Sequence, residues 1–119
     1  YINMRVQFGR PIASFQAIKH KTADILLDVE LAKAGAYYAA AAADAPDEDD
    51  DLAALAAIAK AAASETYIAT AVYAVQMHGG IGFTWDNDTH LWFKRAKASE
   101  VFLGHANQHR ERLMQAWNV

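Results

Sequence analysis

The stretch FQAIKHKTADILLDVELAKAGAYYAAAAAD, residues 15–44, decides the fold of this 119-residue chain. Apolar or small side chains recur along it at alternating intervals of three and four residues, which keeps one face of an α-helix against a partner: Phe15, Ile18, Thr22, Ile25, Val29, Ala32, Ala36 and Ala39. The stretch therefore predicts a long bundle helix whose alanine-rich end lets a neighbouring backbone approach closely. We expect the acidic segment 44–49, with Pro46, to end this helix as a solvated connection and not as a metal site.

A second long helix is predicted from about Asp50 to Met77, because acidic residues at its start suit the helix dipole. Its expected buried stripe is Leu55, Ile58, Ala62, Ala69 and Val72 or Tyr73. Gln76 continues that stripe, and a polar amide on a buried face needs partners, which invites a functional interpretation. After His78 and the glycines, Asp86 or Asn87 is expected to cap a third helix that runs to about Phe102. A final amphipathic helix follows Gly104.

The first residues are interpreted as the tail of a helix whose beginning is missing. Gly9 and Pro11 would break that helix, and Ser14 would cap the next one. We therefore expect residues 1–119 to be one domain and a fragment of a longer chain. The predicted fold class is all-α, an antiparallel bundle of the four-helix type.

Composition excludes several classes of function. The chain has no cysteine, so disulfides and thiolate chemistry are ruled out, and its histidines lack the spacing of a metal centre. A formal net charge of −3 gives no case for nucleic-acid binding. We expect no membrane span, because no apolar run approaches the roughly 20 residues that one needs. Without a secretory leader, the expected location is the cytoplasm.

Two motifs stand out as candidate binding elements. The first is Gln76-Met77-His78-Gly79-Gly80, continued by Ile81-Gly82-Phe83, in which glycines at a helix end expose backbone amides. The second combines Arg5 and Phe8 with Gln16 downstream, a guanidinium, an aromatic face and an amide around one corner. Taken singly, the first motif equally describes an ordinary helix C-cap, and the second an ordinary turn with a surface arginine.

Together the two motifs resemble the acyl-CoA dehydrogenase family, whose C-terminal domain reads R-x-x-F-G-x-x-I, F-Q, a long helix pair and Q-x-x-G-G-x-G-[FY]. The resemblance covers essentially the whole chain. It implies a helical bundle that packs in a tetramer, holds FAD between subunits and serves the dehydrogenation of an acyl-CoA in fatty acid or lipid metabolism, with electron-transfer flavoprotein as acceptor. Arg5 would contact the FAD pyrophosphate, Phe8 the cofactor and Gln16 its adenosine side. The adenosine diphosphate of FAD bound mainly by a neighbouring subunit would be lined by Gln76, Met77, His78, Gly79 and Gly80.

One departure from the family concerns the catalytic base. Many members carry a glutamate in a Glu-Gly-Thr segment, and the matching position here, 27 residues after Gln76, is Leu103, followed by Gly104 and His105. Leucine cannot accept the α-proton, so no catalytic residue is assigned in this chain. We interpret His105 as a helix-start or FAD-side residue, with a substitute base as the minor alternative, and Glu100 as a structural or surface residue. The base then lies on a helix upstream of Tyr1 or on another subunit of a mixed tetramer.

Two other functions stay open at this point. The chain can be a non-catalytic structural subunit, or a helical interaction module in a mixed acyl-CoA dehydrogenase complex. Pure packing does not require the arginine, amide and glycine set, which favours the cofactor-binding interpretation. The aromatic pairs Tyr37-Tyr38 and Trp92-Phe93 are expected in the core or in an interface.

Overall fold

The computed structural model describes residues 1–45 and 51–118. A small hairpin of two short strands precedes four α-helices, with two 3-10 turns between them. In chain order the elements are β1 (Val6–Gln7), β2 (Arg10–Pro11), η1 (Ile12–Ser14), α1 (Gln16–Asp44), α2 (Leu52–His78), η2 (Gly79–Phe83), α3 (Thr89–Val101) and α4 (Ala106–Ala116). The prediction of an all-α fold is confirmed.

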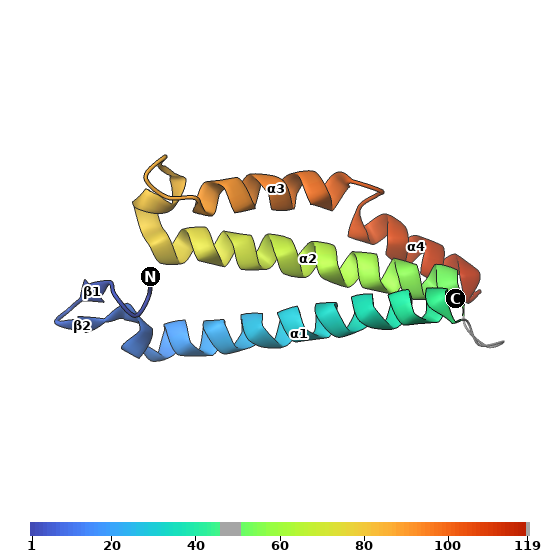
Figure 1. The fold of residues 1–119 in the computed structure, drawn as a ribbon, viewed down its shortest axis with the longest axis horizontal. Coiled ribbons are helices and arrows are strands. Elements are labelled where there is room, and N and C mark those ends of the chain that lie inside the picture. The colour runs from blue at the N-terminus through green and yellow to red at the C-terminus, as the bar shows by residue number, and fades with distance from the viewer. Residues whose placement is uncertain (46–50, 119) are drawn as a thin grey trace.

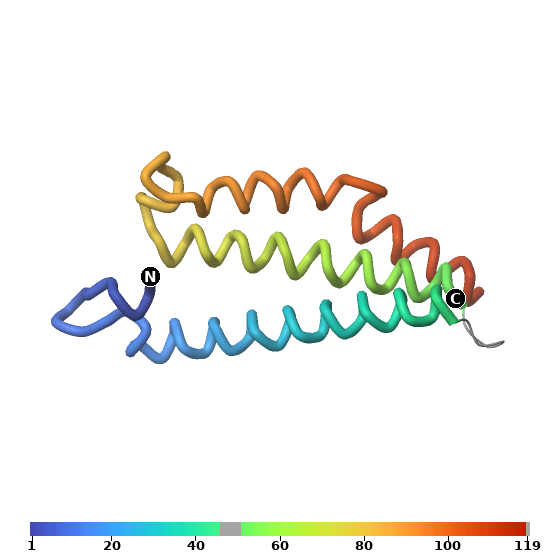
Figure 2. Tube along the Cα trace, in the orientation of Figure 1, coloured from blue at the N-terminus to red at the C-terminus, as the bar shows by residue number. Residues whose placement is uncertain are grey.

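Helix α2 is the central element. Helix α1 runs antiparallel along one side of it, and α3 and α4 follow one another along the opposite side (Figure 1). The resulting domain is elongated, with principal extents of 59 × 28 × 25 Å. The Cα trace shows that the start of α1 and the end of α2 lie at the same end of the bundle (Figure 2).

Small side chains form the contacts of α2 with its neighbours. Its buried residues are Ala54, Ala57, Ala61, Ser64, Ala71 and Val75. This face lies one position before the predicted stripe, which is therefore wrong in phase. The reason is that α2 is apolar almost all round and has neighbours on two sides, so its sequence contains no single apolar face. Gln76 is consequently exposed and not core-facing.

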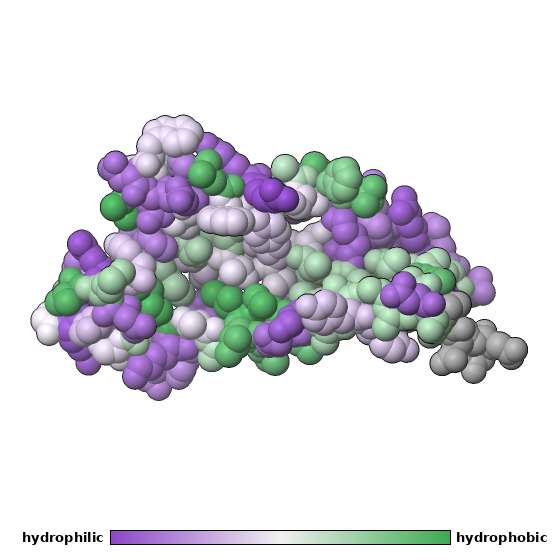
Figure 3. All heavy atoms as spheres, in the orientation of Figure 1, coloured by the Kyte–Doolittle hydropathy of each residue, from purple (hydrophilic) through white to green (hydrophobic). Residues whose placement is uncertain are grey.

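Among residues 1–45 and 51–118, α2 is the helix that packs along the length of α1, and the predicted stripe of α1 is only partly covered. Ala32 is buried, Ile18, Ile25 and Ala39 are half-buried, and Thr22, Val29 and Ala36 are exposed. The hydropathy surface shows an apolar area over the middle of this helix (Figure 3). Its strongly exposed leucines are Leu26, Leu27 and Leu31.

The aromatic pairs are also on the surface. Tyr37, Tyr38 and Trp92 are exposed, so the core interpretation of these residues is wrong, while Phe93 is half-buried. Their use in an interface stays a prediction.

Asp51 caps α2 as predicted for the helix start, whereas the N-cap of α3 is Asp88 and Asn87 lies one residue before it. The Asp51 carboxylate accepts from the Ala54 amide at 3.0 Å, and the Asn87 side chain accepts from the Thr89 amide at 2.8 Å. Ser14 does not cap α1: it lies in the turn η1, and its hydroxyl is buried without a hydrogen-bond partner. The predicted start at Asp50 and most of the acidic connection, including Pro46, lie outside the described residues.

The N-terminal segment is a helical turn only over residues 1–5, where the Arg5 amide donates to the Tyr1 carbonyl at 2.9 Å, and residues 6–11 form a hairpin. Strands β1 and β2 pair antiparallel, and Phe8 and Gly9 connect them with φ values of 53° and 76°. Positive φ at both loop positions gives the hairpin turn that matches strand twist. The Ile12 amide donates to the Arg5 carbonyl at 2.8 Å, which extends the pairing. These local hydrogen bonds explain why the predicted helix tail, residues 1–7, does not extend over Val6 and Gln7.

Helix α2 also corrects the expectation about membrane spans. The segment Leu52–Phe83 is long and apolar enough to cross a membrane by length and composition. Its many alanines contribute to this hydropathy together with larger apolar residues such as Leu55, Ile58 and Ile68. In the structure, α2 uses its apolar surface to contact α1 on one side and α3 and α4 on the other.

Candidate functional site

The two predicted motifs lie at one end of the bundle, because α1 and α2 are antiparallel (Figures 1 and 2). Tyr1 connects them directly. Its ring stacks on the His78 ring with centroids 4.2 Å apart, and its hydroxyl donates to the His78 carbonyl at 3.4 Å. The structure thus places the hairpin with Arg5 and Phe8 beside the turn that follows α2. Sequence reasoning missed Tyr1, because no local pattern signals a contact across 77 positions.

The hairpin is anchored to the start of α1 through Phe15. The Arg10 guanidinium carbon lies 4.1 Å from the centroid of the Phe15 ring, a cation–π contact that sequence reasoning also missed. Phe8 meets Phe15 edge-on at 6.1 Å but is 91% exposed. Arg5 is exposed and forms none of the ion pairs found among residues 1–45 and 51–118. Both side chains are therefore available to a ligand.

The glycines after α2 differ in what the fold requires of them. Gly79 has φ 65° and closes the helix, with its amide bonded to the carbonyls of Gln76 and Val75. A Cβ atom on Gly82 would lie 2.9 Å from the Val75 carbonyl oxygen and 3.0 Å from the His78 Cβ. Gly80 has neither constraint: its φ is not positive and a Cβ would meet nothing within 4 Å. The fold explains Gly79 and Gly82 but not Gly80.

Before these glycines, the Gln76 side-chain amide is exposed and the His78 ring is held by a hydrogen bond. Gln76 is exposed, and Met77 and His78 are half-buried. The Nδ1 atom of His78 lies 2.7 Å from the Ala74 carbonyl oxygen, and since a carbonyl only accepts, Nδ1 carries the proton. The ring is thereby held at the end of α2. Gln16, the remaining predicted residue, is exposed as the first residue of α1.

The turn between α3 and α4 contains Leu103, the position that the sequence resemblance matches to a catalytic glutamate. Leu103 has φ 63°, and residues 101–105 contain no carboxylate. Glu100 is half-buried and pairs with Lys97 at 2.7 Å, and this hydrogen bond lowers the pKa of Glu100, which agrees with a structural or surface role. His105 precedes α4 as its N-cap residue, as expected of a helix-start residue.

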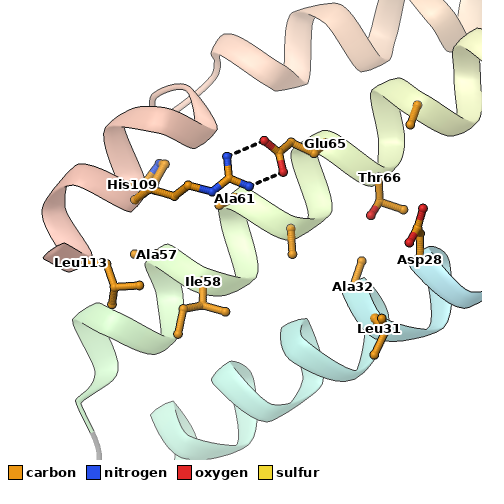
Figure 4. A pocket seen from close by; sticks show the side chains of 13 residues that line it. Asp28, Leu31, Ala32, Ala57, Ile58, Ala61, Glu65, Thr66, His109 and Leu113 are labelled. Carbon is orange, nitrogen blue, oxygen red and sulfur yellow. Dashed lines mark hydrogen bonds and ion pairs between the residues drawn. The ribbon is translucent and has the colours of Figure 1, made fainter.

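A separate cavity of about 450 Å³ lies between α1, α2 and α4 (Figure 4). Alanines of α2 line it together with Asp28, Thr66 and His109, and none of the eight predicted binding residues does. Arg110 spans its edge and pairs with both carboxylate oxygens of Glu65, which lowers the pKa of Glu65. Arg110 therefore joins α4 to α2. The part of the chain that the structure describes holds no group of three or more potential metal ligands.

The family model for the acyl-CoA dehydrogenase C-terminal domain matches residues 1–117 of this chain. The chain belongs to the acyl-CoA dehydrogenase family. It is 42% identical over 113 residues to acyl-CoA dehydrogenase IpdE2 of Mycolicibacterium smegmatis, which covers 95% of the chain and 34% of that relative. It is 46% identical over 103 residues to IpdE2 of Mycobacterium tuberculosis, covering 87% of the chain and 30% of the relative.

Solved structures of the family share the fold. Butyryl-CoA dehydrogenase from Megasphaera elsdenii superposes with a TM-score of 0.90 at 30% identity, covering 100% of this chain and 30% of that one. A second structure, described as an FAD-dependent dehydrogenase, gives a TM-score of 0.90 at 28% identity and covers 100% and 31%. This acyl-CoA dehydrogenase chain thus spans about a third of the length of the relatives that it matches most fully.

Proposed function

We propose that this chain is the FAD-contacting and oligomerising part of an acyl-CoA dehydrogenase that introduces an α,β double bond into an acyl-CoA thioester. Family membership and the FAD-dependent dehydrogenase among the similar structures support the cofactor and the reaction class. The observation that carries the proposal is Gly80: the fold does not require a glycine at this position. It lies in the turn beside the hairpin, where Arg5 is exposed.

The chemistry of these residues fits FAD. A guanidinium forms paired hydrogen bonds with a diphosphate, which suits Arg5, and the exposed turn at Gly79 and Gly80 suits close approach of phosphate oxygens. Gln16 opens α1, where the helix dipole favours an anionic group. Phe8 offers an aromatic face at the tip of the hairpin. When bound, FAD accepts the hydride from the β-carbon, and this chain's residues hold and orient its adenosine diphosphate part.

The α-proton needs a base that Leu103 does not provide. In the proposed assembly this base comes from a segment upstream of Tyr1 or from a partner subunit. A homo- or hetero-tetramer accommodates both arrangements, and the exposed leucines of α1 offer apolar surface for subunit contacts. By family resemblance, electron-transfer flavoprotein accepts the electrons.

Arg5→Ala in the full-length protein tests the cofactor assignment, with Arg112→Ala as the control because Arg112 is also exposed and lies on α4. A charge-assisted contact contributes about 1.5–3 kcal/mol. We therefore expect FAD to dissociate at least about tenfold more readily from the Arg5 variant, measured as flavin absorbance per protein after dialysis. Equal flavin retention in the two variants would remove Arg5 from the site. A flavin-free parent complex would favour the structural-subunit alternative.

A further inference from the structure

Three buried side-chain polar atoms have no hydrogen-bond partner among residues 1–45 and 51–118: Ser14 Oγ and both ring nitrogens of His90. His90 is only 5% exposed. Buried polar atoms are paired in most folded proteins, because an unpaired atom loses its bonds to water and gains none in return. These atoms therefore indicate that hydrogen-bonding groups are missing from their surroundings.

The three atoms gather at one end of the bundle. Ser14 lies in η1, directly before α1, and His90 is the second residue of α3. The starts of α1 and α3 lie at the same end, with the end of α2 between them (Figure 1). The middle and the opposite end of the bundle, as far as the structure describes them, contain no such atom. One missing neighbour at this end accounts for all three.

Exposed aromatic side chains surround His90. The Trp85 ring meets the His90 ring edge-on with centroids 4.6 Å apart, yet Trp85 is 81% exposed. The Lys94 Nζ atom lies 5.1 Å from the centroid of the Trp85 ring. Phe83, in the preceding turn, is 65% exposed. Large aromatic side chains that project into solvent beside an unpaired buried group are typical of a surface that another protein segment covers.

The unpaired atoms need a partner that both donates and accepts. A neutral imidazole has one donor and one acceptor, and a serine hydroxyl has both. Diphosphate oxygens only accept, so the part of FAD assigned to Arg5 and the glycine turn would leave a ring nitrogen unpaired. A peptide unit offers a donor and an acceptor together. The chain spans about a third of the length of its relatives, so most of the polypeptide of such an enzyme lies outside residues 1–119.

We propose that a polypeptide segment of the longer enzyme, outside residues 1–119, packs against this end of the bundle and hydrogen-bonds to His90 and Ser14. The segment turns Trp85 away from His90 and covers Trp85 and Phe83 with apolar side chains. This docking surface includes none of the residues assigned to FAD. The inference rests on the proposed function only in that the chain works as part of a longer enzyme.

Oxidative footprinting of the native full-length protein tests whether the surface is covered. Hydroxyl radicals modify exposed tryptophans, and peptide mass spectrometry gives the rate of modification of each one. An indole that is 81% exposed keeps most of the reactivity that it has in the urea-unfolded protein. We expect Trp85 to lose most of that reactivity in the native protein. Retention of most of it would overturn the proposal, and this measurement needs no variant that could fail to fold.

Variants of His90 test the hydrogen bonds in the same full-length protein. His90→Leu removes both ring nitrogens, whereas His90→Gln keeps a donor and an acceptor. We expect His90→Leu to lower Tm by about 2–4 °C and His90→Gln to restore part of that loss. A higher Tm in His90→Leu would overturn the proposal, because an apolar side chain stabilises the protein when it replaces an unpaired buried group. His20→Leu is the control, because His20 is exposed on α1, and its Tm should equal that of the parent.

A photo-cross-linker identifies the segment. With p-benzoylphenylalanine in place of Phe83, we expect illumination to link position 83 to a peptide of the same polypeptide outside residues 1–119, at monomer mass in a denaturing gel. A product of twice that mass would overturn the proposal, since another subunit would then cover the surface. The flavin content of the parent is measured first. A flavin-free parent refutes the proposed function, while the footprint and the Tm values stay readable, so the two failures are distinguishable.

Discussion

Replacing Gly79, Gly80 and Gly82 one at a time by alanine separates what the fold needs from what a ligand needs. At Gly82 the new methyl group would lie 2.9 Å from a backbone oxygen, and overpacking of this kind costs about 1–3 kcal/mol. At Gly79 the φ of 65° makes alanine strained, again by about 1–3 kcal/mol. At Gly80 the space is open, so the stability should change by less than about 0.5 kcal/mol.

The assay compares stability and flavin retention in the same full-length preparations. The apo-proteins are melted to obtain Tm, and the FAD-loaded proteins are dialysed and their flavin absorbance per protein is measured. We expect Gly79→Ala and Gly82→Ala to lower Tm by a few degrees. Gly80→Ala should keep the parental Tm but lose FAD faster, because its methyl group occupies the surface that the cofactor approaches.

Two results would refute this reasoning. Full FAD retention in Gly80→Ala at parental Tm would mean that no ligand approaches the turn at that residue. A large fall in Tm for Gly80→Ala would mean that another part of the protein contacts the turn. Gly35→Ala is the matched control, because Gly35 lies within α1 and a Cβ there also meets nothing within 4 Å.

Three other predictions concern the bundle. Asp51→Ala should destabilise the protein by about 1 kcal/mol in denaturant unfolding, because the α2 cap to Ala54 is lost, whereas an unchanged midpoint would show that the cap is dispensable. Glu65→Gln should lower Tm modestly at pH 7, because the ion pair with Arg110 is lost. Since the Arg110 contact lowers the folded pKa of Glu65, the stabilisation is present above the usual pKa of 4.5 and is lost as pH falls through the folded value. The Tm values of the parent and the variant should therefore converge in acid. Light scattering should find the full-length protein assembled, and a clean monomer would contradict an interface role for the exposed leucines Leu26, Leu27 and Leu31.

The helical fold could be predicted because its signals are long and local. Residues 16–44 and 52–78 form helices almost where the periodicity and the acidic start placed them. The buried face of α2 could not be predicted, because alanines surround the helix and two sides have neighbours. The hairpin was missed because Phe8 occupies a positive-φ position that usually favours glycine or asparagine. Its stability depends on contacts with Phe15 and the start of α1.

The candidate site was found from its motifs, and its geometry required the structure. The sequence shows three glycines after His78, but only the backbone angles and neighbouring atoms distinguish Gly80 from Gly79 and Gly82. The apolar stripe predicts a buried amide at Gln76, but the side chain is exposed. Exposure leaves the amide accessible to a ligand. The positive φ of Leu103 could not be predicted from the sequence either, since it depends on how α4 follows α3.

Tyr1 stacks on His78, and the chain between these two residues runs out along α1 and returns along α2. Those helices have 29 and 27 residues, so the hairpin and the glycine turn meet because the outward and return paths are nearly equal. One inserted residue within α2 would rotate everything beyond it by about 100° and advance it by about 1.5 Å. Seven would nearly restore the direction but displace the turn by about 10 Å. Helix length therefore determines the geometry of this corner as much as any side chain in it, and a length change in one helix requires an equal change in the other.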